Sequence, residues 1–184
     1  DLELVLVEDT SDKLLDKLEH GHIDLALLAL PYQTEKFHTQ VLAKDHFSLV
    51  HHKDYSPAKG VEDFNLLPDA SVFLLEREHC MTGHALSACH LNRSSCINPF
   101  EAASLHTLLS MVEHQLGVTF LPQIAINAGI LKDKNMIATP SQGDAYRDIG
   151  ILWRKTTGRI RDFKLFSQQL EVFLARQCSL DFES

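Results

Sequence analysis

The chain has 184 residues, of which 45% are hydrophobic and 23% charged, and its formal net charge is −8. This is enough apolar material for one ordinary core or two small lobes. The acidic balance argues against a chain that itself binds DNA, because phosphates require clustered Lys and Arg.

Two further classes of protein are disfavoured by the sequence. No apolar run approaches the roughly 18 residues of a spanning helix, and no secretory signal pattern is present, so we expect a cytoplasmic protein without a membrane partner. Four cysteines in such a chain are typical of reduced thiols, or of a transient, catalytic or sensing disulfide, rather than of a structural framework.

The first thirty residues predict a strand, a helix and a second strand. "LELVLV", residues 2–7, alternates and is partly β-branched, as strands are. A helix follows, which Thr10 or Ser11 can cap and Gly21 can end. Its apolar stripe consists of Leu14, Leu15 and Leu18. The continuous apolar run "IDLALLAL" predicts a buried strand of a parallel sheet, so residues 2–30 should form one right-handed β-α-β unit.

The middle of the chain continues the alternation. "HTQVLAKDHFSLVHHK" predicts strands interrupted by polar residues, and "GVEDFNLL" a short helical segment. "ASVFLLE" predicts a strand that leads directly to His79 and Cys80. The following "MTGHALSACHLN" predicts a helix with Gly83 as its weak point.

The last third predicts two amphipathic helices and three strands. "SLHTLLSMVEHQLG" is a helix that Ser104 can cap and Gly117 can end. "VTFLPQIAI" predicts a strand and then a turn, and "MIATPSQGDAYRDIGILWRK" two strands around a Gly-containing loop. "IRDFKLFSQQLEVFLARQ" predicts the final helix.

Alternating strands and helices favour an α/β fold with a doubly wound sheet. The pattern breaks near residues 40–45 and returns near 143–150, so the chain would cross twice between two lobes. Such crossings leave a cleft, where ligands commonly bind. We expect subdomain I to comprise residues 1–42 and 149–184, and subdomain II to comprise residues 43–148.

Two segments resemble a known family. "SLHTLLSMVEHQLGVTFLPQIAI" is similar to the hallmark of LysR-type transcriptional regulators: Ser-Leu, an amphipathic helix, then Gly-Val/Ile-Thr-Phe/Leu-Leu-Pro. "KLLDKLEHGHIDLALLAL" resembles the same family's leucine-rich helix and Gly-x-x-Asp-Leu-Ala strand. The resemblance covers nearly the whole chain and implies a periplasmic-binding-protein-like effector domain of two Rossmann-like subdomains. The family's first regulatory strand and helix, winged helix-turn-helix and linker helix have no counterpart in it.

"EHCMTGHALSAC" is similar to the hydrogen-peroxide-sensing members of this family, in which a His-Cys dipeptide ends a strand and a second Cys lies nine residues on. The resemblance implies that Cys80 is the peroxidatic thiol and Cys89 the resolving thiol. It places His79 and Arg147 beside the reacting sulfur. It also implies that Thr10, with Cys80 and Arg147, binds the peroxide.

The chemistry of these residues supports that assignment. Only a thiolate attacks peroxide, and an unperturbed Cys has a pKa near ~8.5. Cys80 is expected where a strand meets a helix, whose first N–H groups and partial positive charge stabilise a thiolate. The sulfenic acid that forms condenses with a nearby thiol.

The spacing of the two cysteines suggests a switch. Nine helical residues rise about 13 Å, at roughly 1.5 Å each, whereas a disulfide needs Cα atoms within about 7 Å. Cys80 and Cys89 can therefore join only if the helix between them melts, which turns oxidation into an order–disorder transition. Thr82, Gly83 and Ser87 lower helix stability and make melting easier.

Each assignment has a simpler alternative. Cys80 and Cys89 could be ordinary buried thiols, and Thr10 could simply cap its helix. His79 could be structural, and Arg147 could be a solvated charge at a strand end. The two other cysteines are expected to be bystanders: Cys96 and Cys178.

Other functions fit the sequence less well. A zinc site could draw on His79, Cys80, His84, Cys89, His90 and Cys96. Their spacing lacks paired zinc knuckles except for His79 and His84, so no metal and no cofactor is expected.

Enzyme functions are also disfavoured. The chain contains neither the Gly-x-Ser-x-Gly motif of a hydrolase nor an evident pair of catalytic carboxylates. The family resemblance disfavours a thiol peroxidase, because a sensor needs only one oxidation per signal, so we do not expect an enzyme. A LysR-type domain that binds an organic metabolite in the cleft, with incidental cysteines, remains the alternative.

The resemblance also implies partners. We expect a homodimer or homotetramer that contacts promoter DNA through an N-terminal winged helix-turn-helix outside this chain, and RNA polymerase. Hydrogen peroxide would be the signal, and thiol reductants such as glutaredoxin would reset it. The melted helix would repack against a neighbouring subunit and reorient the DNA-binding domains.

Overall fold

A computed structural model describes residues 3–30, 35–58, 61, 63–76, 80–89, 91, 94–141 and 145–179 of the chain. Of Cys80 and Met81 it describes the backbone alone. The strands are β1 (Leu25–Leu30), β2 (Phe37–His52), β3 (Val72–Leu75), β4 (Ile97–Ala102), β5 (Val118–Pro122), β6 (Met136–Pro140) and β7 (Tyr146–Arg154). The α-helices are α1 (Ser11–Glu19), α2 (Cys80–Ala88), α3 (Leu105–Glu113), α4 (Gln123–Asn127) and α5 (Ile160–Gln177). Short 3-10 turns lie at Ser56–Ala58, Phe64–Leu66 and Ser94–Cys96.

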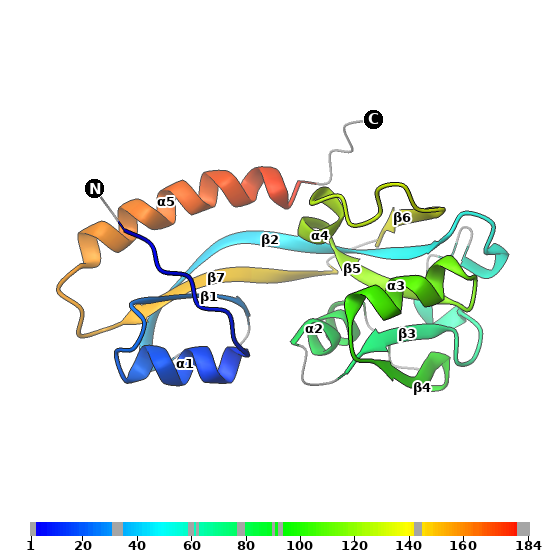
Figure 1. Ribbon diagram of the computed structural model, residues 1–184, viewed down its shortest axis with the longest axis horizontal. Helices are drawn as coiled ribbons and strands as arrows, with labels where there is room; N and C mark the ends of the chain where they lie inside the picture. The colour runs from blue at the N-terminus through cyan, green and yellow to red at the C-terminus, as the bar shows by residue number, and fades with distance from the viewer. Residues whose placement is uncertain are drawn as a thin grey trace.

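One sheet joins the described strands in the order β1-β7-β2-β5-β3-β4, with β6 also paired to β2. The long strand β2 connects its two halves. Residues 37–46 of β2 pair with β7, and residues 47–52 pair with β5 and β6. Figure 1 shows β2 and β7 running along the middle, from the half with α1 and α5 to the half with α2 and α3. We call β1, β7 and residues 37–46 of β2 the first half of the sheet, and the rest the second half.

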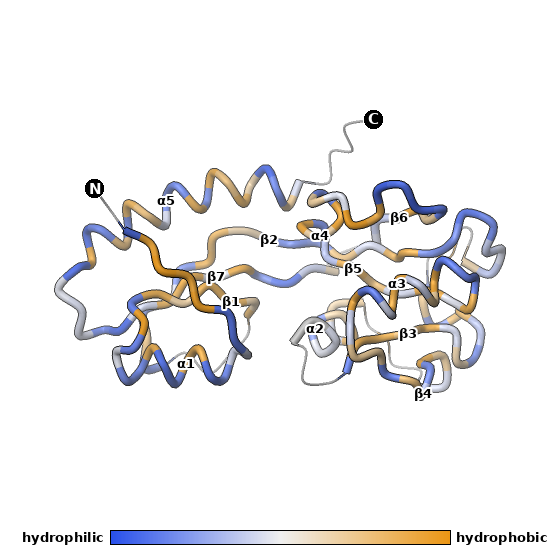
Figure 2. The backbone as a smooth tube through the Cα atoms, in the orientation of Figure 1, coloured by the Kyte–Doolittle hydropathy of each residue, from blue (hydrophilic) through white to orange (hydrophobic). Residues whose placement is uncertain are grey.

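Helices cover both faces of each half, which confirms the predicted α/β fold. In the first half, α1 packs through Leu18 against Leu28 and Leu152, while α5 packs through Phe163 against Trp153. In the second half, α2 and the residue after it add Ala85 and Cys89 to the cluster around Phe120, and α3 adds Leu109 and Val112 to the cluster around Val50. Figure 2 shows hydrophobic segments along the strands of the second half and hydrophilic ones in the connections at its outer end.

The four predicted helices are confirmed as α1, α2, α3 and α5. Ser104 caps α3, because its hydroxyl accepts a hydrogen bond from the Thr107 N–H at 3.2 Å. Gly117 ends the turn between α3 and β5, where a Cβ would stand 2.1 Å from the Ser71 carbonyl oxygen. This close approach explains the glycine of the Gly-Val-Thr-Phe motif. None of the described helices is long and apolar enough to cross a membrane.

The strand predicted at residues 2–7 is wrong for the described residues 3–7, which form no strand. The side chains of Leu4, Val5 and Leu6 are 58%, 82% and 91% exposed. An alternating pattern forms a strand only where a neighbouring strand accepts its backbone hydrogen bonds, and none of the described strands pairs with residues 3–7. The segment instead borders an open groove with β1 and α5. The β-α-β unit of residues 2–30 is therefore reduced to α1 and β1.

Three details of the sheet also differ from the prediction. β1 pairs antiparallel with β7, although its continuous apolar sequence favoured a parallel neighbour. The segment predicted as several strands is the single strand β2, whose register shifts between Val41 and Ala43. β4 was not predicted, because Pro99 and polar residues interrupt it; such residues are tolerated at the edge of a sheet, where β4 lies.

Candidate functional site

The helix α2 begins at one predicted redox cysteine and ends one residue before the other. Cys80 is its first residue, and the Cys89 N–H donates to the Ala85 carbonyl at 2.9 Å, so the helical turn continues to Cys89. An intact helix holds two Cα atoms nine positions apart at about 13 Å, which is beyond the reach of a disulfide. The predicted separation is therefore present in this fold, and Cys89 is a free thiol.

Cys89 is a core residue. Its side chain is 5% exposed and packs in the cluster that contains Ala85, Cys96 and Phe120. Burial raises the pKa of the Cys89 thiol to about 12, while the neighbouring Ser141 hydroxyl weakly opposes this shift. In this fold Cys89 is therefore a protonated, shielded thiol that has to leave the core before it can react.

Arg147 is a largely covered cation that is paired with a buried carboxylate. Its Nε and Nη2 donate to Asp45 Oδ2 at 3.0 and 2.9 Å, and its side chain is 12% exposed. Asp45 lies on β2 and is fully buried, and its Oδ1 accepts from the Ile124 N–H at 3.0 Å. The alternative that Arg147 is a solvated strand-end charge is therefore wrong. Sequence reasoning missed Asp45, although an acidic residue inside an apolar strand pattern is a signal of this kind of pair.

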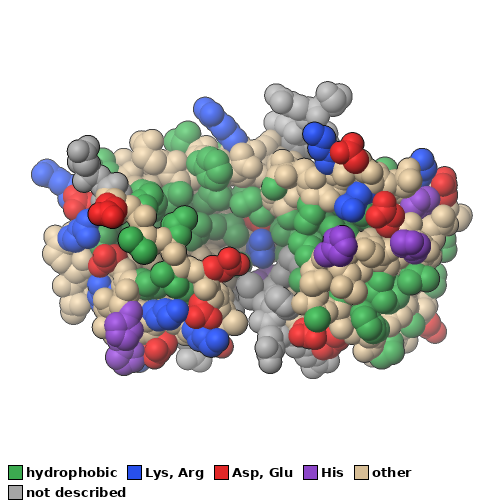
Figure 3. Space-filling model, viewed as in Figure 1, with side chains coloured by type: hydrophobic (Ala, Val, Ile, Leu, Met, Phe, Trp, Pro, Cys, Tyr) green, Lys and Arg blue, Asp and Glu red, His purple; other side chains and the backbone are tan. Residues whose placement is uncertain are grey.

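His84 connects α2 to the first half of the sheet. Burial lowers its pKa, the positive charge of Arg147 lowers it further, and a hydrogen bond with the backbone of Ala29 on β1 opposes both. Arg147 therefore lies beside α2. Figure 3 shows a hollow between the two halves, with a basic side chain and a histidine visible within it. His84 was considered only as a zinc ligand; no three His, Cys, Asp or Glu side chains of the described residues gather in a metal-binding arrangement.

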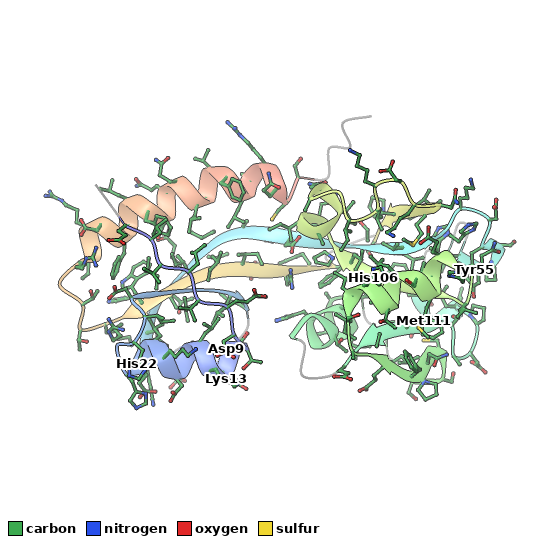
Figure 4. All side chains as sticks on the ribbon, viewed as in Figure 1. Asp9, Lys13, His22, Tyr55, His106 and Met111 are labelled. Carbon is green, nitrogen blue, oxygen red and sulfur yellow. The ribbon has the colours of Figure 1, made fainter. Side chains whose placement is uncertain are left out.

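Thr10 stands at the N-terminus of α1. It is exposed, and its hydroxyl makes no cap hydrogen bond. Its N–H donates to Asp9 Oδ1 at 3.0 Å, and Lys17 Nζ donates to the other carboxylate oxygen at 2.9 Å, which holds the pKa of Asp9 at about 2. Figure 4 shows Asp9 and Lys13 at the end of α1 nearer to α2. Side-chain capping therefore does not occupy the Thr10 hydroxyl.

Two predicted site features lie outside the described residues: His79, and the side chain of Cys80. The structure thus describes Thr10, Cys89 and Arg147 in full, and their roles stay predictions. The expected bystander Cys96 is fully buried. The other, Cys178, is buried near the Arg147 ion pair; burial, and then the negative charge of Asp45, raise the pKa of its thiol to about 11.

A family model of the LysR substrate binding domain matches residues 1–174. The chain belongs to this family. Its structural neighbours are regulatory domains of OxyR proteins, so it is an OxyR-like regulatory domain of a LysR-type transcriptional regulator. The resemblance stated from the sequence is thereby confirmed.

Three relatives give the range of similarity. The reduced regulatory domain of OxyR2 from Vibrio vulnificus is 41% identical, with a TM-score of 0.83 over 89% of this chain and 78% of that one. The HTH-type transcriptional regulator EstR from Acinetobacter baylyi is 36% identical over 178 residues, which are 95% of this chain and 58% of EstR. The hydrogen peroxide-inducible genes activator of Haemophilus influenzae is 31% identical over 158 residues, 84% of this chain and 52% of that protein. The chain spans little more than half the length of these curated relatives.

The Asp45–Arg147 pair predicts that removing the charge of Asp45 lowers the stability of the fold substantially. Asp45→Asn leaves the Arg147 guanidinium buried without its counter-charge, which should cost about 3 kcal/mol of unfolding free energy. Urea denaturation measures this value. Asp16→Asn is the matched control, since Asp16 faces His20 at 3.3 Å with both side chains exposed, and it should change stability by less than about 0.5 kcal/mol. Equal effects of the two variants would contradict a structural role for the buried pair.

The burial of Cys89 predicts slow alkylation. In the reduced, folded OxyR-like domain, iodoacetamide at pH 8 should leave Cys89 almost unmodified, because the thiol is 5% exposed and its pKa is raised to about 12. In denaturant, where the pKa returns to its usual range, labelling should become rapid. Peptide mass spectrometry measures both rates. Fast labelling of Cys89 in the folded protein would show that α2 is open before any oxidation.

Proposed function

We propose that this chain is the peroxide-responsive regulatory domain of an OxyR-type transcriptional activator. The observation that carries the proposal is the geometry of α2, which begins at Cys80 and keeps the buried Cys89 about 13 Å along the helix. The 41% identity to the OxyR2 regulatory domain and the names of several curated relatives, hydrogen peroxide-inducible genes activators, support it.

The first proposed step is oxidation of Cys80. Its thiolate attacks one oxygen of hydrogen peroxide, the S–O bond forms, the O–O bond breaks, and the departing hydroxide takes a proton to become water. The N-terminus of α2 stabilises the thiolate. Arg147, held in orientation by Asp45, would stabilise the departing oxygen, with Thr10 binding the peroxide and His79 orienting the loop or exchanging protons.

The second proposed step joins the two cysteines. Cys89 attacks the sulfenic sulfur of Cys80, the S–S bond forms, and the hydroxyl group leaves as water with the proton of Cys89. This step requires α2 to unfold, because the intact helix keeps the sulfurs apart. Unfolding also hydrates Cys89, whose pKa then falls from about 12 towards that of a free thiol, so Cys89 becomes a nucleophile only after release.

Unfolding of α2 would affect the rest of the domain, because α2 contacts both halves of the sheet. When α2 unfolds, His84 leaves the Ala29 backbone, which belongs to the other half of the sheet. We propose that subdomain I (residues 1–42 and 149–184) and subdomain II (residues 43–148) then rearrange. In the intact homodimer or homotetramer this would reorient the DNA-binding domains and alter contact with promoter DNA and RNA polymerase, until a thiol reductant such as glutaredoxin restores the dithiol.

A second candidate function follows from the similarity to EstR, which is 36% identical over 95% of the chain and whose name mentions no peroxide. In this alternative a small organic effector binds in the hollow between the halves, and the cysteines are incidental. The two candidates differ in their response to Cys80→Ser: the peroxide response disappears in that variant, whereas a metabolite response is retained.

The proposal predicts one specific disulfide. A small excess of hydrogen peroxide added to the reduced protein should produce a Cys80–Cys89 disulfide, seen by mass spectrometry of peptides prepared without reductant. Cys80→Ser should abolish it, and the matched control Cys96→Ser should not. Four free thiols after treatment, or oxidation spread over the cysteines by exposure alone, would exclude the sensor function and direct attention to the effector alternative.

If α2 must unfold before the disulfide forms, a substitution that stabilises α2 should shift the redox equilibrium towards the dithiol. A Cβ at Gly83 would meet no atom within 4 Å, so Gly83→Ala should stabilise the helix by about 1 kcal/mol without a clash. Since about 1.4 kcal/mol corresponds to 30 mV, the midpoint potential of the Cys80–Cys89 pair should become about 20 mV less negative.

Titration against a glutathione buffer measures that potential. Gly158→Ala is the matched control, because a Cβ there is equally free of contacts but lies outside α2. An unchanged potential in Gly83→Ala would mean that α2 stays folded in the oxidised protein.

A further inference from the structure

The short helix α4 connects the ion pair of Asp45 and Arg147 to the end of α5. It has only five residues, and so short a helix does not persist without contacts to the rest of the fold. Figure 1 shows α4 near the C-terminal end of α5. Hydrogen bonds at both ends of α4 supply these contacts, and they decide where the helix lies.

At its first turn, α4 binds the carboxylate that orients Arg147. The Ile124 N–H, which has no partner inside the helix, donates to Asp45 Oδ1 at 3.0 Å. The other oxygen, Oδ2, accepts both hydrogen bonds from Arg147. A carboxylate held through one oxygen can still rotate about its last carbon–carbon bond, whereas contacts to both oxygens fix its plane. The position of α4 therefore determines the direction in which Asp45 holds the guanidinium.

Gln123 anchors α4 from inside the fold. Its side chain is fully buried, and burial of an amide is unfavourable unless its polar atoms are hydrogen-bonded. Its Nε2 donates to Asn127 Oδ1 at 2.8 Å, which ties the first residue of α4 to the last. Its Oε1 accepts from the Ser48 hydroxyl of β2 at 3.4 Å. Gln123 thus fixes α4 to the strand that carries Asp45.

Asn127 anchors α4 to α5. Its Nδ2 donates to the carbonyl oxygens of Gln177 and Ser179, both at 2.9 Å. These carbonyls flank Cys178, whose buried thiol lies near the ion pair of Arg147. Because the last carbonyls of a helix have no partner within it, Asn127 also completes the C-terminus of α5. A path of hydrogen bonds therefore leads through α4 from the end of α5 to Arg147.

We propose that Gln123 and Asn127 are positioning residues for Arg147: they hold α4, α4 holds Asp45, and Asp45 directs the guanidinium towards the oxygen that departs from peroxide. This inference rests on the proposed redox function, in which Arg147 stabilises that oxygen. It adds two residues that act through Asp45 rather than on the peroxide. Stabilisation of developing charge depends on donors that are held in place before the reaction, so a displaced α4 should slow the oxidation.

The test compares two reactions of Cys80 in the reduced chain. Oxidation by hydrogen peroxide has a departing oxygen for Arg147 to stabilise, whereas alkylation by iodoacetamide expels iodide instead. Gln123→Met keeps the length of the side chain and removes both hydrogen bonds, and Asn127→Ala removes the link to α5. Each should lower the rate constant with peroxide by about tenfold, less than the roughly hundredfold loss expected when the donor itself is removed in Arg147→Ala. The rate constant with iodoacetamide should stay the same.

A second measurement observes Arg147 directly. In nitrogen-15 NMR of the reduced chain, the Nε–H that Arg147 donates to Asp45 should exchange slowly with water. This exchange should become faster in Gln123→Met and in Asn127→Ala. Gln168→Met is the matched control, because it makes the same chemical change at an exposed position of α5. It should alter neither the rate constants nor the Nε–H exchange.

Three results would overturn the inference: an unchanged Nε–H exchange in the two variants, an unchanged rate constant with peroxide, or an equal fall of both rate constants, which indicates a general loss of structure. If Cys80 of the unmodified chain reacts with peroxide no faster than a free cysteine, the proposed function fails instead. The Nε–H exchange needs no peroxide, and it still decides whether Gln123 and Asn127 hold Arg147.

Discussion

An intact helix cannot be spanned by a disulfide between its ends, and the properties of this domain depend on that constraint. α2 begins at Cys80, and its last turn reaches Cys89. The rise of the helix keeps the two backbones about 13 Å apart, and the core shields the second thiol, whose pKa is raised to about 12. One structural element thus separates the two proposed redox cysteines and suppresses the nucleophilicity of Cys89, so a disulfide between them requires α2 to unfold.

The buried ion pair between Asp45 and Arg147 connects this helix to the rest of the sheet. Asp45 stands on β2 where that strand passes from one half to the other, and Arg147 reaches it from β7. The same guanidinium lowers the pKa of His84 on α2, while the backbone of Ala29 opposes the shift. The two hydrogen bonds to the buried Asp45 carboxylate fix the orientation of the Arg147 guanidinium. α2 is therefore coupled electrostatically and sterically to both halves of the fold.

Local features of α2 favour the release that the proposed function requires. A Cβ at Gly83 would meet no atom within 4 Å, and a small cavity without room for a water molecule borders Thr82 and Ala85 of α2. A glycine inside a helix costs about 1 kcal/mol relative to alanine, which is small for a whole domain but large for one short helix. Elements that move in regulation are drawn from the least stable parts of a fold, and α2 has this character while its surroundings are closely packed.

The sequence by itself determined four of the five described α-helices, the α/β class, the family and the nine-residue spacing of Cys80 and Cys89, because helical periodicity and local motifs are local properties of the chain. It missed the short helix α4, where it predicted a turn. It misled at residues 2–7, since a strand needs a partner strand for its backbone hydrogen bonds and none of the described strands pairs with residues 3–7. Only the tertiary structure decided that Arg147 is paired with Asp45 and that Cys89 is a core thiol beside Ser141. Burial and pairing join residues about a hundred positions apart, such as Asp45 and Arg147, and no local pattern records which distant side chain will be the neighbour.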